Sequence, residues 1–294
     1  MPGLQQTYQR ISAPVQQCIN SVVSLMKVAF LSRTPPKLDR LKSAENHQLV
    51  LLGNGPSLQS SMRGGIPKDS TSFMAVNTFV FSDAFEAFKP RYYVMMDPGL
   101  WRADNELTQK TTASLIQKTA WELHLLIPYD ARSSALVQQL SQNKHIHIHF
   151  LNYVVYKGFR SLGFRLYASN RAMPQAQNVL VAALFLGLNL GYKRVLLFGA
   201  DHNWHQHLEV NAENVVCVRQ VHFYENESEV KLVPFYKAMH VQETFRMDEL
   251  FHAWAKVFHG YHQVAEYAAS RGATILNATP GSFVDAFDRI PEQK

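Results

Sequence analysis

The sequence has few cysteines and no hydrophobic run long enough to cross a membrane. Cys18 and Cys217 are the only cysteines among 294 residues, so we expect no disulfide framework and no cysteine-based metal site, and a reducing compartment is favoured. A membrane-spanning helix needs roughly 20 apolar residues in succession, and polar residues interrupt each apolar run before that length. Polar residues near the N-terminus give no sign of a secretory signal. We therefore expect a soluble, cytoplasmic protein.

Acidic residues are scarce in the first 46 residues. This segment holds +4 of the net charge of +6, because its acidic residues are only Asp39 and Glu45. The remainder of the chain is close to neutral, which argues against a nucleic-acid partner. Apolar residues at helical spacing predict one amphipathic helix over residues 12–32. These apolar residues are Ile19, Val22, Val23, Met26 and Phe30.

Two interpretations of this helix are open. In the first, the helix packs on the main domain or on a second subunit of a homo-oligomer. Alternatively, residues 12–42 rest on the anionic inner face of the cell membrane. We treat residues 1–46 as an N-terminal helix with a basic linker, and residues 47–294 as the main domain.

Short apolar runs alternate with polar or helical stretches from residue 48 onward. This alternation predicts an α/β fold with a mainly parallel, Rossmann-like sheet flanked by helices. Residues 202–246 are polar and lack clear periodicity, so we expect a lid inserted over the site. A long helix is expected over residues 247–270. The other expected elements are strands at 49–52, 72–76, 92–96, 123–127, 145–150 and 273–276, a helix at 179–190, and a strand from 193 that stops at Asp201.

The first expected strand ends in a loop suited to a phosphate or a nucleotide. Gly53 and Gly55 lack a Cβ atom, so backbone N–H groups there can approach a ligand closely. Asn54 and Ser57 add side-chain donors, and a helix beginning near Pro56 would direct its positive end at the same place. The third glycine of the dinucleotide fingerprint is absent, which favours a mononucleotide.

Small polar residues also follow several of the other expected strands. The carboxyl ends of parallel strands meet at one edge of a sheet, where ligands bind in this fold class. Each residue alone is most often a helix cap or a turn former, but their recurrence favours a binding site. The residues are Asn54, Ser57, Asn77, Asp97, Asp201, Asn277, Thr279 and Ser282.

Three histidines alternate with apolar residues in the run 145–150. His145, His147 and His149 would share one face of a strand, but residues two apart on a strand rarely converge on one ion. We expect solvent-exposed histidines on an edge strand, and the sequence predicts neither a metal site nor a cofactor.

Several short motifs occur in an order that is typical of one group of enzymes. They are Gly53–Leu58, Val76–Phe79, Met96–Trp101, Gly191–Asp201 and Thr279–Ser282. The series resembles the bacterial lipooligosaccharide sialyltransferases of glycosyltransferase family forty-two, and more closely the MptE-like proteins found with surface-polysaccharide genes. The resemblance covers about residues 48–290. It implies a single GT-A-type domain with a lid and a CMP-activated sugar as donor.

The resemblance also implies the residues that bind substrate. Asn54 and Asn77 would contact the donor nucleotide, and Asn178 would lie near the cytidine. The complete predicted set is Gly53, Asn54, Gly55, Pro56, Ser57, Asn77, Asp97, Asn178, Gly199, Asp201, Asn203, Tyr224, Thr279 and Ser282.

Two departures from the family's pattern concern the phosphate. Asp97 stands where the family has an asparagine, and a carboxylate there repels phosphate but accepts from ribose hydroxyls. Asn203 stands where a tyrosine helps the phosphate to leave. Tyr224 or His222 in the lid would replace that tyrosine.

The family's reaction is metal-independent and inverting, with a histidine as general base. Such a base needs a pKa near the working pH and a place beside the acceptor hydroxyl. The candidates are His252, His222 and His202, with His259 as a neighbour of the first. The predicted function is transfer of sialic acid or a related nonulosonic acid from a CMP-sugar to a cell-surface glycan or glycolipid.

Two other functions are open. A 6-hydroxymethylpterin pyrophosphokinase would need ATP, Mg²⁺ and clustered carboxylates, for which the strand ends supply only Asp97 and Asp201. A non-catalytic nucleotide-binding protein of polysaccharide biosynthesis would need none of these.

Overall fold

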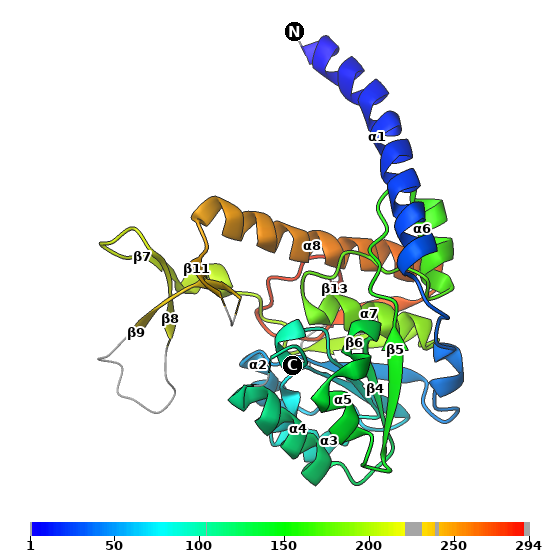
Figure 1. The fold of residues 1–294 in the computed structure, drawn as a ribbon, viewed down its shortest axis with the longest axis vertical. Coiled ribbons are helices and arrows are strands. Elements are labelled where there is room, and N and C mark those ends of the chain that lie inside the picture. The colour runs from blue at the N-terminus through cyan, green and yellow to red at the C-terminus, as the bar shows by residue number, and fades with distance from the viewer. Residues whose placement is uncertain (1, 104, 221–230, 239–240, 291–294) are drawn as a thin grey trace.

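The computed structural model describes residues 2–103, 105–220, 231–238 and 241–290, and its centre is an eight-stranded sheet (Figure 1). The strand order is β13-β12-β6-β1-β2-β3-β4-β5, and each neighbouring pair is parallel. This confirms the predicted α/β fold with a mainly parallel sheet. The bounds are β1 Gln48–Leu52, β2 Thr71–Val76, β3 Tyr92–Val94, β4 Leu123–Pro128, β5 Ile146–Leu151, β6 Arg194–Phe198, β12 Thr274–Asn277 and β13 Asp288–Arg289.

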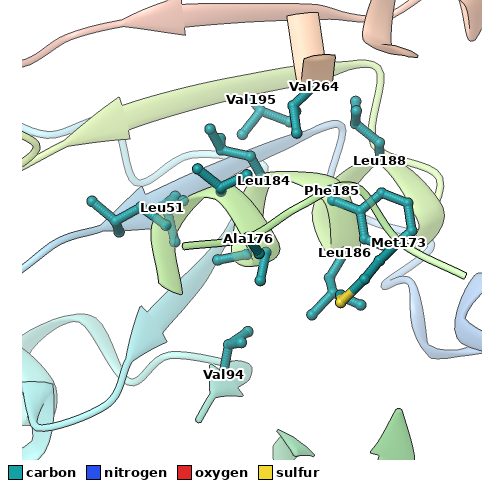
Figure 2. Close-up of a cluster of buried hydrophobic side chains, with 14 of the residues drawn as sticks. Leu51, Val94, Met173, Ala176, Leu184, Phe185, Leu186, Leu188, Val195 and Val264 are labelled. Atoms are coloured by element: carbon teal, nitrogen blue, oxygen red, sulfur yellow. The ribbon is translucent and has the colours of Figure 1, made fainter. Parts of the chain in front are cut away.

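Helices cover both faces of this sheet, because side chains of a strand point alternately to its two faces. Leu49 and Leu51 of β1 join one apolar cluster, drawn in part in Figure 2, and Val50 and Leu52 join the other. The first cluster packs under α6 Arg160–Ala168, α7 Val179–Asn189 and α8 Met247–Ser270, and the second under α2 Ser57–Gly64, α3 Ala84–Phe88, α4 Glu106–Lys118 and α5 Ala135–Leu140. Short 3₁₀ helices are η1 Leu38–Leu41, η2 Phe79–Phe81, η3 Pro98–Leu100, η4 Tyr129–Ser133 and η5 Trp204–His207.

The segment predicted as an irregular lid contains five short strands. They form a three-stranded and a two-stranded antiparallel sheet, which lie beside the start of α8 and away from the main sheet (Figure 1). These strands do not have one buried and one exposed face, since the neighbouring residues Leu208 and Glu209 are both half-buried. The sequence therefore lacks the alternation of apolar and polar residues that predicts a strand. The bounds are β7 Leu208–Val210, β8 Val216–Gln220, β9 Lys231–Pro234, β10 Tyr236–Ala238 and β11 Val241–Thr244.

The N-terminal helix is longer than predicted. Helix α1 spans Pro2–Leu31 instead of 12–32, contains Pro14, and projects from the rest of the molecule (Figure 1). Within the described residues, no helix combines the length and apolar character that crossing a membrane requires.

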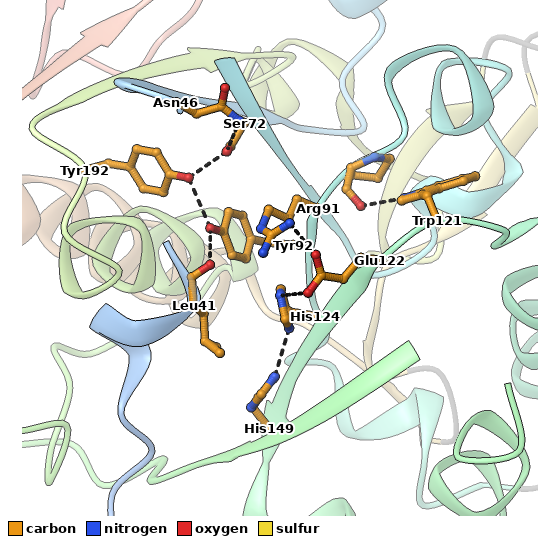
Figure 3. A network of polar contacts seen from close by, with 11 residues as sticks. Leu41, Asn46, Ser72, Arg91, Tyr92, Trp121, Glu122, His124, His149 and Tyr192 are labelled. Atoms are coloured by element: carbon orange, nitrogen blue, oxygen red, sulfur yellow. Dashed lines mark hydrogen bonds and ion pairs between the residues drawn. The ribbon is translucent and has the colours of Figure 1, made fainter. Parts of the chain in front are cut away.

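A buried polar network at the amino ends of the strands attaches the linker after α1 to the sheet (Figure 3). The Tyr92 hydroxyl donates to the Leu41 carbonyl at 2.8 Å and lies 3.1 Å from the Tyr192 hydroxyl. Tyr192 in turn donates to Ser72 Oγ at 2.6 Å. Burial raises the pKa of Tyr92 well above its ordinary value, so it stays a hydrogen-bond donor.

The histidines of the edge strand β5 are only partly solvent-exposed. His147 is exposed as predicted, but His149 is half-buried, and its Nε2 lies 3.1 Å from Nδ1 of the buried His124 (Figure 3). Burial lowers the pKa of His124 to about 4 and also lowers that of His149. Both imidazoles are therefore neutral at pH 7. Among the residues described, no three His, Cys, Asp or Glu side chains lie where they could hold a metal ion.

Candidate functional site

The order of the strands changes direction between β1 and β6. Strands β1 to β5 succeed one another on one side, whereas β6, β12 and β13 lie on the other. In parallel sheets a ligand crevice forms beyond the carboxyl ends of the strands at such a switch point. We therefore expect a ligand site at the loops that follow β1 and β6.

The glycines of the first loop pack against the loop that follows β6. Gly53 N donates to Phe198 O at 2.8 Å, and Gly55 N donates to Gly199 O at 2.9 Å. A Cβ atom on Gly53 would lie 2.4 Å from Gly199 O. These glycines permit two backbones to approach each other, so the prediction that their N–H groups face a ligand is wrong.

The start of α2, predicted to hold a phosphate, is occupied by a carboxylate of the protein itself. Asp201 accepts from Ser57 N at 3.2 Å and from Ser57 Oγ at 2.8 Å. Its Oδ2 lies 1.9 Å from where a Cβ of Gly55 would be. A negative side chain at a helix N-terminus stabilises the helix and repels an anion from the same position. Ser57 and Asp201 are therefore structural partners.

Two further predicted contacts are internal hydrogen-bonding groups. Thr279 Oγ1 donates to Leu197 O and accepts from Ala200 N, both at 3.1 Å. Ser282 Oγ donates to Ala200 O at 2.6 Å. Both side chains are buried. They attach the loop after β12 to the end of β6, so the structure does not bring them to a ligand.

Asn77 and Asp97 likewise bond to nearby backbone. Asn77 has a positive φ of 45° and its Oδ1 accepts from Met96 N at 3.1 Å, which ties the ends of β2 and β3 together. Asp97 accepts from Gly99 N at 2.9 Å and caps η3. Neither residue is among those that line the cavities described next.

A cavity of about 390 Å³ opens at the switch point and gathers most of the remaining predicted residues. We call it the smaller cavity. Asn54 is exposed there, with Nδ2 at 3.5 Å from Val76 O, and Asn178 and Asn203 are half-buried. The predicted residues that line it are Asn54, Gly55, Pro56, Asn178, Gly199, Asp201, His202 and Asn203.

The N-terminus of α7 faces this smaller cavity. Asn178 caps the helix by accepting from Leu180 N at 2.8 Å, and Val179 and Leu180 also line the cavity. The first turn of α7 carries no acidic side chain. The positive dipole end of α7 is therefore capped by a neutral amide and not by a carboxylate, in contrast to that of α2, and it favours an anion nearby.

His202 lies in the wall of the smaller cavity and is buried. Its Nε2 lies 2.7 Å from the Tyr261 hydroxyl, and its ring stacks on Trp204 with 4.3 Å between ring centroids. Desolvation by burial lowers the pKa of His202 to about 4. A general base works best with a pKa near the working pH, so His202 suits a positioning role better than proton transfer.

A larger cavity of about 600 Å³ adjoins the smaller one, between the short strands and α8. Its walls are mainly apolar, with four aromatic side chains, and Arg219 adds one charged group. Pro56, Asn178, Trp204 and His207 line both cavities, so the two spaces meet there. The aromatic residues are Trp204, Phe235, Phe245 and Trp254.

The histidine at this junction is His207, which the sequence did not single out. It is half-buried at the end of η5, and its Nε2 lies 3.5 Å from Asn203 Nδ2. The sequence feature that could have indicated His207 is the cluster of histidines that follows Asp201. Their spacing does not distinguish His207 from His205, because a 3₁₀ turn decides which side chain faces inward.

Of the other candidate bases, the two that the structure describes do not line these cavities. Helix α8 lines the larger cavity with Leu250, Ala253, Trp254 and Val257, and His252 is exposed on a different face. The structure places His259 in a separate cavity of about 340 Å³. His222 and Tyr224 lie outside the described residues.

No protein-family model, curated protein or solved structure matches this chain. The resemblance of its motifs to sialyltransferases and MptE-like proteins therefore stays a prediction.

Proposed function

We propose that the protein is a glycosyltransferase that moves a sugar from a CMP-activated donor to an acceptor hydroxyl. The observation that supports this most is the pair of adjoining cavities at the switch point, which share Asn178, Trp204 and His207. A transfer between two substrates requires neighbouring sites whose reacting groups meet. The resemblance of the motifs supplies the class of donor, a CMP-sugar such as activated sialic acid.

The smaller cavity suits the donor nucleotide. Asn54, Asn178 and Asn203 contribute amides, which both donate and accept hydrogen bonds. Asp201 repels phosphate from the α2 end of the cavity, and the N-terminus of α7 attracts it. We therefore expect the phosphate at the α7 end, where the positive dipole end of the helix stabilises the charge that develops as CMP leaves.

The larger cavity suits the acceptor, proposed to be a cell-surface glycan or glycolipid. Aromatic walls with a few polar groups are typical of cavities that bind an organic ligand. His207 accepts the proton of the acceptor hydroxyl, whose oxygen bonds to the anomeric carbon of the donor sugar. The bond between that carbon and the phosphate oxygen breaks, and CMP leaves.

Calorimetric titration tests the donor class. We expect CMP and CDP to bind with the same affinity with and without Mg²⁺, and Asn54→Ala to weaken binding about tenfold, the value of one hydrogen bond of about 1.4 kcal/mol. Absence of binding by any cytidine nucleotide would overturn the proposal. Magnesium-dependent binding of ATP instead would favour the pyrophosphokinase.

Release of CMP from CMP-sialic acid tests the base. We expect His207→Gln to lower the rate on the order of 100-fold or more with unchanged affinity for CMP. His252→Gln is the matched control and should keep the full rate. The reverse pattern would assign the base to His252.

A further inference from the structure

Helix α1 packs on the domain with its polar face. Ser24 Oγ donates to Lys157 O at 2.9 Å and accepts from Lys157 N at 3.0 Å. Ser21 Oγ accepts from Phe159 N at 2.9 Å. Ser21, Ser24 and Val28 are the residues that α1 buries between positions 14 and 31. The serine hydrogen bonds, together with Val28, which joins the apolar cluster under α7 and α8, attach the helix.

Six apolar residues of α1 face the opposite way and form a stripe, in which each residue is between 42% and 76% exposed. At about 100° per residue, the centre of this apolar stripe lies roughly 180° around the helix from the buried serines. Helix α1 thus packs on the main domain, as one interpretation predicts, but the apolar stripe is not the face that packs. The apolar stripe comprises Val15, Ile19, Val22, Val23, Met26 and Phe30.

An uncovered apolar stripe of this kind marks an interaction site. The spacing of its residues along the helix favours a flat partner over a second helix. Along the stripe, Val15, Ile19, Val22, Met26 and Phe30 recur about every 3.7 residues, above the 3.5 that a two-stranded coiled coil requires. A straight helix keeps such positions on one side along its whole length.

The charges beside the stripe favour an anionic surface. The first acidic residue of the chain is Asp39, so the preceding residues carry only positive charge. Lys27 in α1 and Arg33 and Lys37 just after it are exposed. If two α1 helices packed together, their basic residues would find no acidic partner on the other helix. This disfavours self-association through α1.

We propose that the apolar stripe of α1 lies on the surface of a bilayer that contains anionic lipid, with its side chains at the boundary of the acyl chains. Asn152 follows β5 and bonds to both Arg33 N at 2.7 Å and Arg33 O at 3.0 Å. The helix thus joins the domain at the carboxyl edge of the sheet, the edge where the cavities open. This inference does not depend on the proposed chemistry.

Flotation of the full-length protein with vesicles tests the proposal. We expect binding to vesicles of phosphatidylcholine with phosphatidylglycerol, and binding at least tenfold weaker for the variant with Met26→Gln and Phe30→Gln together. Lys27→Glu should weaken binding several-fold, since one basic residue near an anionic surface is equivalent to about fivefold in affinity. The effect of Lys27→Glu should shrink on vesicles of phosphatidylcholine alone or at high salt, whereas the effect of the apolar double variant should persist at high salt.

Ile116→Gln and Lys144→Glu are matched controls, because both residues are exposed on the main domain. They should leave binding unchanged, and circular dichroism should show all variants folded. Failure of the parent protein to float with anionic vesicles would overturn the proposal. Light scattering that shows an oligomer dissociated by the double variant, without any change in flotation, would assign α1 to self-association instead.

Discussion

Two parts of the carboxyl edge differ in what their polar side chains contact. In the braced part, Ser57, Asp201, Thr279 and Ser282 bond to one another or to backbone. In the open part, the side chains line the two adjoining cavities. The open part consists of Asn54, Asn178, Asn203 and His207.

A polar residue at a strand end can contact a ligand only through atoms that the fold does not already use. Asn54 follows β1 as Ser57 does and so satisfies the same sequence rule, yet only Ser57 is bonded to Asp201. The braced part makes the edge rigid, and the open part is available to bind. Substitutions in the first should change stability, and those in the second should change ligand binding.

The largest effect is expected where two backbones touch. Gly53→Ala places a Cβ 2.4 Å from Gly199 O, and overpacking of this kind costs about 3 kcal/mol. Urea unfolding measures the loss. Gly64→Ala is the control, since a Cβ there meets nothing within 4 Å and should change stability by less than about 1 kcal/mol. Equal losses in the two variants would contradict the close approach of the loops.

His202 lies between the two parts and predicts an acid-dependent loss of stability. Its pKa is about 4 when folded against an ordinary 6.5, so the unfolded chain binds more protons between these values. The stabilisation is complete above pH 6.5 and decreases toward pH 4, by about 3 kcal/mol for a shift of this size. His202→Asn should remove this part of the decrease.

Urea unfolding between pH 4 and 8 measures this effect. His124→Asn is a parallel test. It should remove a similar part of the loss of stability in acid, because burial also lowers the pKa of His124 to about 4. A pH profile of His202→Asn that is parallel to that of the parent protein would show that the imidazole is not desolvated.

A smaller effect is expected for the carboxylate at the start of α2. Asp201→Ala removes the bonds to Ser57 N and Oγ and should cost about 2 kcal/mol, the upper range for a helix cap. Asp83 precedes α3 without a side-chain cap bond, so Asp83→Ala should cost less than about 0.5 kcal/mol. A loss of less than about 0.5 kcal/mol for Asp201→Ala would show that its bonds to Ser57 do not stabilise the fold, and Asp201 would then belong to the open part.

The smallest effect on stability belongs to the open part. Asn54 is exposed, and its bond to Val76 O is long at 3.5 Å. Asn54→Ala should therefore change the free energy of unfolding by less than about 0.5 kcal/mol while weakening CMP binding. A large loss of stability without a change in binding would place Asn54 in the braced part.

Much of the fold could be predicted from the sequence. The apolar runs at β1, β2, β4 and β6 gave the parallel sheet, because short buried strands need near-continuous apolar residues. The small sheets of residues 208–244 were not predicted, since their strands are short and partly exposed on both sides. The predicted residues at the switch point share a cavity, but Asp201 among them bonds to Ser57 at the start of α2 and does not leave that position to a phosphate. The sequence did not predict His207.

The α/β class, the edge at which polar residues gather, and the amphipathic character of α1 all follow from the sequence, through local periodicity and the rule that parallel strands end together. That Asp201 occupies the start of α2, and that α1 packs through Ser21, Ser24 and Val28, is evident only in the folded chain. Each of these depends on contacts between residues far apart in the chain, which no local pattern encodes.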